Sequence, residues 1–456
     1  MARALWLSRE IHGELVRLAV PTIVSTLAVP LLGVADTAIL GRLPDVTHLA
    51  AAAAANTILN AVFWIFGFLR MGTTALVAQA SGQGDPRESA RLLFQASAVG
   101  GALGLLLVAG RGPMGWIGFH LVGAAPEVTA LAKEYYAIRI FEAPVFLIGL
   151  GITGYLRGRG DAITPMLFTL GVNLVNIAGD LLLVPGWWGL PSLGVRGAAW
   201  ASLIAQWTGG VGLVLAVWPR VRRHVSREWL SGWRRLPWGR FLRVQQDLFF
   251  RTLFLVVTMA AITALAARLQ DPHELAAHAV LLQLWSLVSY AVDGFAYATE
   301  TTVGTWLGRG RPQAARASAQ AALLWGVGIG ILFALVYRAG VDAIARFFTT
   351  DPRVQQILHE LVVVIAVSQP VNALAYIFDG ILIGATDTRF LRRAMLTSSA
   401  AFFAAVAAGW AVWGLSLAVI WWSAVVFMAA RSLTLAVRFR SPAWIAAART
   451  RRAGEP

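Results

Sequence analysis

A few carboxyl and amide side chains stand inside apolar stretches of this sequence, where they are the residues best suited to chemistry. In the segment LLGVADTAILGRL, Asp36 is the sole formal charge between Arg17 and Arg42. In NLVNIAGDLLLV, Asn176 and Asp180 are four residues apart and therefore share one face of a helix. A carboxylate in such surroundings is costly unless it binds a proton, faces a polar cavity or coordinates a hard cation such as sodium. These residues predict a site that binds and releases a cation.

The elements that carry these residues are expected to be membrane-spanning helices. Of the 456 residues, 58% are hydrophobic and 13% are charged, whereas a soluble protein has about 25% charged residues. Apolar runs of membrane-spanning length lie near residues 18–40, 49–79, 91–112, 126–156, 162–184, 193–218, 246–268, 275–306, 315–337, 354–383, 394–412 and 415–437. The sequence thus predicts an all-α, multi-pass membrane protein. It contains no cysteine, which excludes thiolate catalysis, disulfides and cysteine metal sites.

The distribution of arginine predicts the orientation in the membrane. With both termini inside, the inside segments hold 25 arginines and the outside segments hold 7, as the positive-inside rule requires. The net charge of +15 is therefore ascribed to cytoplasmic loops and not to nucleic-acid binding. The N-terminal segment MARALWLSREIHGELVRL is charged and lacks a small-residue cleavage site, so no cleaved signal peptide is expected.

An internal repeat relates the two halves of the chain. At one offset of 226 residues, GQGDP (82–86) aligns with GRGRP (308–312), and GYLRGRGD (154–161) aligns with GILIGATD (380–387). Because the offset covers six spans, both halves have the same orientation and are expected to be related by a pseudo-two-fold axis along the membrane normal. The predicted parts are a first lobe over 1–217, a basic cytoplasmic linker over 218–245, a second lobe over 246–437 and a basic cytoplasmic tail over 438–456.

The two halves differ in their polar residues. The second-lobe equivalents of Asp36, Asn176 and Asp180 are apolar and are, in that order, Ile262, Phe402 and Val406. Asn173 lies on the same helix side as Asn176, so the first lobe is predicted to hold the polar cluster. The second lobe carries other polar residues within apolar runs, namely Asp293, Glu300, Tyr376 and Asp379. They are interpreted either as a structural network with Arg251 or as the wall of a cavity that receives a cationic substrate.

Two prolines lie within the span that carries Asp36. Pro21 and Pro30 cannot continue the helical hydrogen-bond ladder. They predict a kink, either static or able to bend beside a titratable group.

Several segments, in order, resemble the multidrug and toxic compound extrusion (MATE) family. They are VPLLGVADTAILGRL, YYAIRIFEAP, LRGRGDAITPM, NLVNIAGDLLLV and GVRGAAWASLIAQ, while DGFAYATE and AYIFDGILIGATDTRFLRRAM resemble its DinF-like branch. The resemblance covers nearly the whole chain. It implies twelve helices in two six-helix bundles and cation-coupled antiport of organic, often cationic, compounds across the bacterial plasma (inner) membrane.

The resemblance also implies roles for particular residues. Asp36 matches the family's first-helix proton site, whose protonation is proposed to bend that helix, and Asn176 with Asp180 matches the fifth-helix polar pair. Tyr135, Asn173 and Ser202 are placed in the substrate cavity of the first lobe, with Ser202 standing where relatives often have threonine. Glu142 is a departure, since an uncharged residue is expected there.

The sequence leaves the coupling ion and a few alternative functions to be considered. The coupling ion is expected to be a proton, with sodium as the alternative, and no other cofactor or bound metal is expected. A lipid or lipid-linked oligosaccharide flippase of the same superfamily needs cavity arginines, for which Arg139 and Arg251 are the mid-span candidates. An intramembrane enzyme lacks a nucleophile with a base or a metal cluster, and a passive channel lacks a symmetric polar ring. One chain contains both lobes, so a monomer is expected to function.

Overall fold

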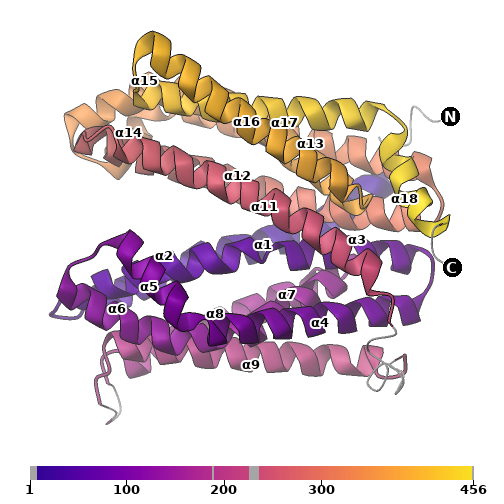
Figure 1. Cartoon of the computed structure of the whole chain (residues 1–456), viewed down its shortest axis with the longest axis horizontal. Helices are drawn as coiled ribbons and strands as arrows, with labels where there is room; N and C mark the ends of the chain where they lie inside the picture. The colour runs from indigo at the N-terminus through magenta and orange to yellow at the C-terminus, as the bar shows by residue number, and fades with distance from the viewer. Residues whose placement is uncertain (1–7, 187–188, 190, 225–235, 454–456) are drawn as a thin grey trace. The chain divides into compact units, whose positions relative to one another are not determined.

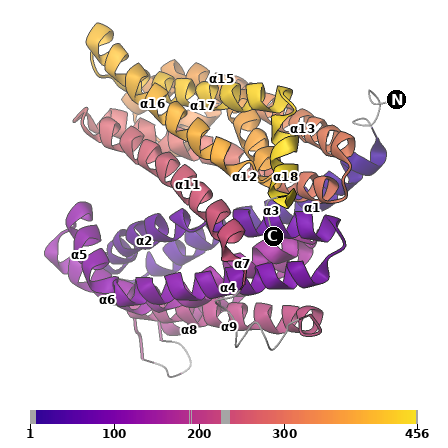
Figure 2. The same ribbon diagram turned by 45° about the vertical axis from the view of Figure 1, so that its right-hand side comes forward.

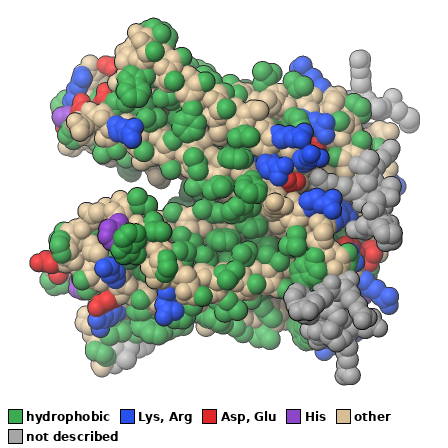
Figure 3. Space-filling model, in the orientation of Figure 1, with side chains coloured by type: hydrophobic (Ala, Val, Ile, Leu, Met, Phe, Trp, Pro, Cys, Tyr) green, Lys and Arg blue, Asp and Glu red, His purple; other side chains and the backbone are tan. Residues whose placement is uncertain are grey.

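The computed structural model is built of helices, without strands in the part of the chain that it describes (Figure 1). It describes residues 8–186, 189, 191–224 and 236–453. Twelve helical segments of these residues are long and apolar enough to cross a membrane. On the face drawn in Figure 3, hydrophobic side chains cover the middle of the helices and charged side chains gather toward the helix ends. The all-α, twelve-span prediction is confirmed.

The chain divides into two compact units, which we call the N-unit (Val24–Phe241) and the C-unit (Met1–Ile23 with Leu242–Pro456). The first helix, α1 (Arg9–Leu40), belongs to both. The further helices up to the linker are α2 (Thr47–Ile65), α3 (Phe68–Gly82), α4 (Pro86–Ala109), α5 (Arg111–Val122), α6 (Pro126–Arg139), the short 3₁₀ helix η2 (Ile140–Glu142), α7 (Ala143–Gly158), α8 (Ile163–Leu183) and α9 (Val195–Val221). In both ribbon views α8 and α9 run side by side (Figure 2).

The C-unit contains the remaining helices. They are α11 (Trp238–Ala267), which begins in the N-unit, α12 (Pro272–Gly308), α13 (Pro312–Ala339), α14 (Val341–Phe348), α15 (Pro352–Gly384), α16 (Thr388–Trp413), α17 (Leu417–Arg440) and α18 (Ala443–Ala453). The C-unit therefore repeats the helix order of the N-unit. The change of unit near Phe241 falls inside the predicted linker 218–245, of which residues 225–235 lie outside the described residues, as do residues 454–456 of the predicted tail.

Helix α1 departs from the predicted lobe boundaries, because its first part groups with the C-unit. There Trp325 Nε1 donates a hydrogen bond to His12 Nδ1 at 3.0 Å. A Cβ placed on Gly294 of α12 would lie 2.9 Å from the carbonyl oxygen of Ala19, so the two helices are in close backbone contact. The helix runs continuously through Pro21 and Pro30, and the division between the units falls between these two prolines. Bending at the prolines stays a prediction.

Glycine contacts at the 226-residue offset show that the internal repeat is structural. A Cβ on Gly104 of α4 would lie 2.6 Å from the Pro144 nitrogen, and a Cβ on Gly330 of α13 would lie 3.0 Å from the Pro370 nitrogen. Both pairs of positions are 226 residues apart. The absence of a side chain at these glycines lets each helix approach the backbone of its neighbour, which a larger residue prevents.

A second set of equivalent contacts joins the fourth span of each unit to its second span. A Cβ on Gly158 of α7 would lie 2.7 Å from the Thr74 carbonyl oxygen. At the equivalent place in the C-unit, a Cβ on Gly384 of α15 would lie 2.6 Å from the Glu300 carbonyl oxygen. Each unit is therefore assembled on the same framework of close helix contacts.

The turns of the two units also match. Gly84 and Gly310 end equivalent helices with left-handed φ angles of 73° and 72°, the backbone conformation that favours glycine after a helix. One exception is Thr386, which holds a φ of 56° at the position where the N-unit has Gly160 with a φ of 79°.

Substitution of Gly104 by alanine is expected to destabilise the N-unit. The new Cβ meets the backbone of Pro144, which cannot yield as a side chain can, and overpacking of this kind costs about 1–3 kcal/mol. Thermal unfolding in detergent is expected to show a Tm lowered by roughly 3 °C or more. The matched control is Gly149→Ala on α7, where a Cβ meets nothing within 4 Å. Equal Tm values for the two variants would contradict the packing argument.

Candidate functional site

The carboxyl cluster predicted from the sequence is assembled in the N-unit. Asn176 Nδ2 on α8 donates to Asp180 Oδ2 at 2.9 Å and to Asp36 Oδ1 on α1 at 3.2 Å. The side chains of Asn176 and Asp180 are buried, with 2% and 1% exposure. The four-residue spacing on α8 brings the first pair together, and the packing of α1 adds Asp36. We call these three residues the carboxyl cluster.

The two carboxyl groups of this cluster are brought together on one amide nitrogen, that of Asn176. Asp180 Oδ1 is buried without a donor among the described residues. Two adjacent carboxylates in an apolar environment repel each other, so the pair is stabilised when one of them binds a proton or when a cation lies between them. The arrangement is therefore able to bind and release a positive charge.

Other predicted residues tie α1 to α8 outside the carboxyl cluster. Asn173 Nδ2 donates to the carbonyl oxygen of Ala28 on α1 at 2.7 Å. One turn earlier on each helix, Ser25 Oγ donates to Thr169 Oγ1 at 3.2 Å. Asn173 thus binds the backbone two residues before Pro30, and in this structure it acts as a link between helices.

The N-unit holds a second buried polar group, which is formed by α2, α6 and η2. At the junction of α6 and η2, Arg139 forms a two-pronged ion pair with Glu142, with distances of 3.0 Å and 2.7 Å. Arg139 Nη1 also donates to the Tyr135 hydroxyl at 2.9 Å and to Asn56 Oδ1 at 3.3 Å. Tyr135 therefore faces an arginine. Asn56 of α2 was not singled out from the sequence, because nothing in its spacing links it to α6.

Ser202, predicted to line a substrate cavity, is buried in the N-unit. It is 5% exposed and lies on α9, which packs along α8. It makes no hydrogen bond to Asp36 or Asp180 in the part of the chain that the structure describes. Its predicted place in a substrate cavity stays a prediction.

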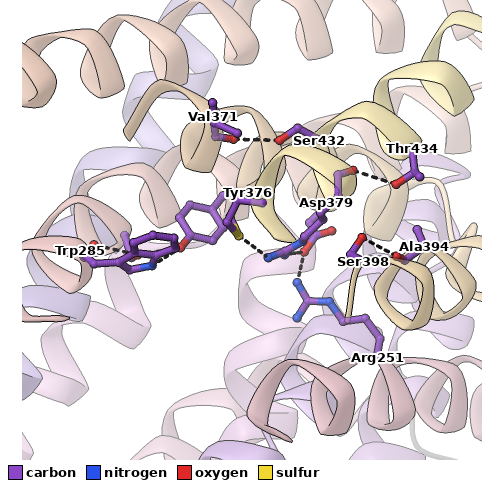
Figure 4. A network of polar contacts seen from close by, with 12 residues as sticks. Arg251, Trp285, Val371, Tyr376, Asp379, Ala394, Ser398, Ser432 and Thr434 are labelled. Carbon is purple, nitrogen blue, oxygen red and sulfur yellow. Dashed lines mark hydrogen bonds and ion pairs between the residues drawn. The ribbon is translucent and has the colours of Figure 1, made fainter. Parts of the chain in front are cut away.

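Asp379 is the centre of a buried ionic network in the C-unit (Figure 4). Asp379 Oδ2 on α15 accepts hydrogen bonds from Arg251 of α11 and Arg431 of α17. Asp293 and Glu300 lie on α12, and Glu300 is buried with 1% exposure. Of the two interpretations from the sequence, this geometry favours the structural network. Arg431 is the partner that sequence reasoning missed, since it lies 180 residues from Arg251.

The tyrosine of this network is held by several groups. Trp285 Nε1 and Ser289 Oγ donate to the Tyr376 hydroxyl at 3.2 Å and 3.0 Å. The Arg431 guanidinium lies over the Tyr376 ring, with 5.6 Å between the carbon Cζ and the ring centroid. Tyr376 thus extends the ionic network toward α12, and its hydroxyl is already engaged.

The polar difference between the units is visible in their packing. Ile262, Phe402 and Val406 stand at the positions equivalent to the carboxyl cluster and are buried in the C-unit core. Within the described residues, no group of three or more histidine, cysteine, aspartate or glutamate side chains is arranged to hold a metal ion. The carboxyl cluster of the N-unit is therefore the candidate functional site.

Comparison with known proteins adds a family context. The family model MatE matches residues 21–182 and 248–408. The DNA damage-inducible protein F of Escherichia coli (strain K12) is 33% identical over 446 residues, covering 94% of this chain and 93% of the relative. A probable multidrug resistance protein NorM of Deinococcus radiodurans is 32% identical over 392 residues, covering 82% and 83%.

Solved structures support the fold. The Vibrio cholerae MATE transporter VcmN in its bent form superposes with a TM-score of 0.81 at 20% identity, covering 97% of this chain and 98% of that chain. A MOP superfamily transporter from Pyrococcus furiosus gives a TM-score of 0.81 at 19% identity, covering 98% of both chains.

Substitution of Asp379 by asparagine is expected to destabilise the C-unit strongly. It leaves Arg251 and Arg431 buried without the carboxylate that they share, and breaking a buried ion pair in this way costs about 3–5 kcal/mol. The control is Asp342→Asn, because Asp342 is 68% exposed and pairs with His359 at the surface. Unfolding in detergent is expected to show a large loss of stability only for Asp379→Asn. A Tm unchanged by that substitution would contradict the structural role of the network.

Proposed function

This chain belongs to the MatE family of secondary transporters, and on that premise we propose that it is a cation-coupled, most simply proton-coupled, antiporter that exports organic, often cationic, compounds by alternating access. It is a multi-pass membrane protein and not an enzyme. Multidrug resistance is named for its NorM relatives, and we propose that this chain exports such compounds. Substrates are then small organic molecules that reach the protein through the bilayer or the cytoplasm.

The observation that carries this proposal is the carboxyl cluster. Asp36 and Asp180 meet in an apolar bundle on two different helices and share the amide of Asn176. Binding a proton removes the repulsion between the carboxyls, and losing it restores the repulsion. Since Asp36 lies on α1, which belongs to both units, the protonation state of the cluster can act on the helix that connects them. This supplies a physical link between a proton and a change of conformation.

The role of Asn176 favours a proton over sodium. Its amide nitrogen donates to both carboxyl groups. A sodium ion at this place would need the amide oxygen turned toward it, because hard cations are bound by oxygen. A proton needs only one carboxyl oxygen, and the amide donor then stabilises whichever carboxyl stays ionised.

The surroundings of Arg139 and Arg251 do not favour a lipid flippase. Arg139 is bound by Glu142 and Arg251 is bound by Asp379. Each guanidinium is therefore engaged by a carboxylate and is not presented to a lipid phosphate.

The arginine distribution supports an orientation with both termini in the cytoplasm, in the plasma (inner) membrane of a bacterium. One chain supplies both units, so the proposed transporter is functional as a monomer.

Transport by the protein in liposomes is expected to depend on Asp36. With an imposed pH gradient, Asp36→Asn is expected to slow the movement of a fluorescent organic cation at least about tenfold, because the amide cannot exchange a proton. The control is Asp45→Asn, since Asp45 lies in the short loop after α1, where its carboxyl accepts a hydrogen bond from the backbone nitrogen of Thr47 at 2.8 Å. Undiminished proton-driven transport by Asp36→Asn would exclude this residue as the coupling site.

A further inference from the structure

Helix α8 carries a row of polar side chains on the side where it meets α1. The members stand three or four residues apart and therefore share one face of the helix; they are Thr169, Asn173, Asn176 and Asp180. The first three each form a hydrogen bond with α1. The row thus holds α1 at successive turns, both before and after its second proline.

The link made by Asn173 goes to the backbone of α1 and not to a side chain. Asn173 Nδ2 donates to the carbonyl oxygen of Ala28 at 2.7 Å, the shortest of the three links. Ala28 is 5% exposed, so this contact lies in the packed interior of the N-unit. Because a bond to a main-chain carbonyl holds the helix itself, the contact sets where α1 lies along α8.

The C-unit contains the same contact at the 226-residue offset. Asn173 is equivalent to Ser399 of α16, whose Oγ donates to the carbonyl oxygen of Phe254 on α11 at 3.5 Å. Phe254 is in turn equivalent to Ala28. A side chain of the fifth span therefore holds the same carbonyl of the first span in both units.

The two contacts differ in the helix that they hold. In α1, Pro30 follows Ala28 by two residues and contributes no N–H to the helical hydrogen-bond ladder. In α11 the equivalent residue is Val256, and the helix contains no proline. A helix bends most readily where a proline interrupts its ladder. The course of α1 through Pro30 therefore depends on bonds from α8, whereas α11 is straightened by its own ladder.

We propose that Asn173 is a positioning residue of this transporter, which holds α1 before Pro30 so that Asp36, which follows that proline, reaches the carboxyl cluster. This inference rests on the proposed antiport. Without the bond from Asn173, α1 is free to bend at Pro30 and to carry Asp36 away from the amide of Asn176. The two carboxyl groups then no longer share one amide, and proton exchange is uncoupled from the position of α1.

Two substitutions of Asn173 separate the hydrogen bond from the fit of the side chain. Asn173→Leu keeps a similar size but has no donor, whereas Asn173→Gln keeps the amide donor on a longer side chain. The matched control is Ser399→Ala, which removes the equivalent contact from α11. Proton-driven uptake of a fluorescent organic cation into liposomes is measured for the wild type and for each variant.

We expect Asn173→Leu to slow transport about fivefold or more, and Asn173→Gln and Ser399→Ala to stay within about twofold of the wild type, since loss of coupling between linked sites has effects of this size. If the fit of the side chain mattered and the donor did not, the longer glutamine would be the more harmful of the two substitutions. Transport that is slower in Asn173→Gln than in Asn173→Leu, or unchanged in Asn173→Leu, would overturn the proposal.

A second measurement does not depend on transport. The chain has no cysteine, so spin labels can be attached to cysteines that replace two exposed residues, Val34 of α1 and Ile204 of α9. Pulsed electron paramagnetic resonance then gives the distribution of distances between the labels in the purified protein. We expect Asn173→Leu to broaden or displace this distribution and Asn173→Gln to preserve it.

Identical distributions in the wild type and in both Asn173 variants would overturn the positioning role. A distribution altered only in Asn173→Leu, together with absence of proton-driven transport in the wild type, would support that role and contradict the proposed function alone.

Discussion

The structure depends on one constraint, which is that a carboxylate inside an apolar helix bundle must be neutralised or bound. The two units meet this constraint in different ways. In the C-unit, Asp379 is bound by two arginines, and the result is a permanent ionic network. In the N-unit, Asp36 and Asp180 share the amide of Asn176 and form no ion pair with a basic side chain among the described residues, so we ascribe their neutralisation to an exchangeable charge. The first arrangement stabilises a fold, and the second allows a cycle of binding and release.

The two units share one framework of close helix contacts and differ in the polar residues that this framework carries. Equivalent glycines, such as Gly104 and Gly330, bring equivalent helices into close contact in both units. The positions that face the unit interiors then differ, with Asp180 in one unit and Val406 in the other. Helix α1 contributes to both units, as its equivalent α11 also does, and it carries Asp36 in its second part. Asp36, a residue of the carboxyl cluster, therefore lies on a helix whose first part belongs to the C-unit.

The sequence was sufficient for features that depend on local spacing and hydropathy. Twelve apolar segments, the repeat offset and the shared face of Asn176 and Asp180 all follow from periodicity. Arg431 and Asn56 were missed, because their partners are distant in the chain and only packing brings them together. The division of α1 between the units was also missed, since an apolar helix of 32 residues carries no signal of which neighbour each half contacts.

Glu142 combines a contact that local spacing predicts with contacts that only the folded structure creates. The sequence marks it as a charge within an apolar run, and Arg139 stands three residues earlier, a spacing at which helical side chains meet. The ion pair is thus readable from the sequence, although the contact of Arg139 with Asn56 is not, because α2 and α6 meet only in the folded N-unit.

The central claim is that the carboxyl cluster releases a proton in exchange for an organic cation that the transporter binds. The most direct measurement is the proton release that follows addition of a fluorescent organic cation to the purified protein in weakly buffered detergent solution. The account predicts that protons are released from the wild type and not from a variant in which both Asp36 and Asp180 are asparagine. Cation binding without proton release in the wild type, or equal release from the variant, would contradict it.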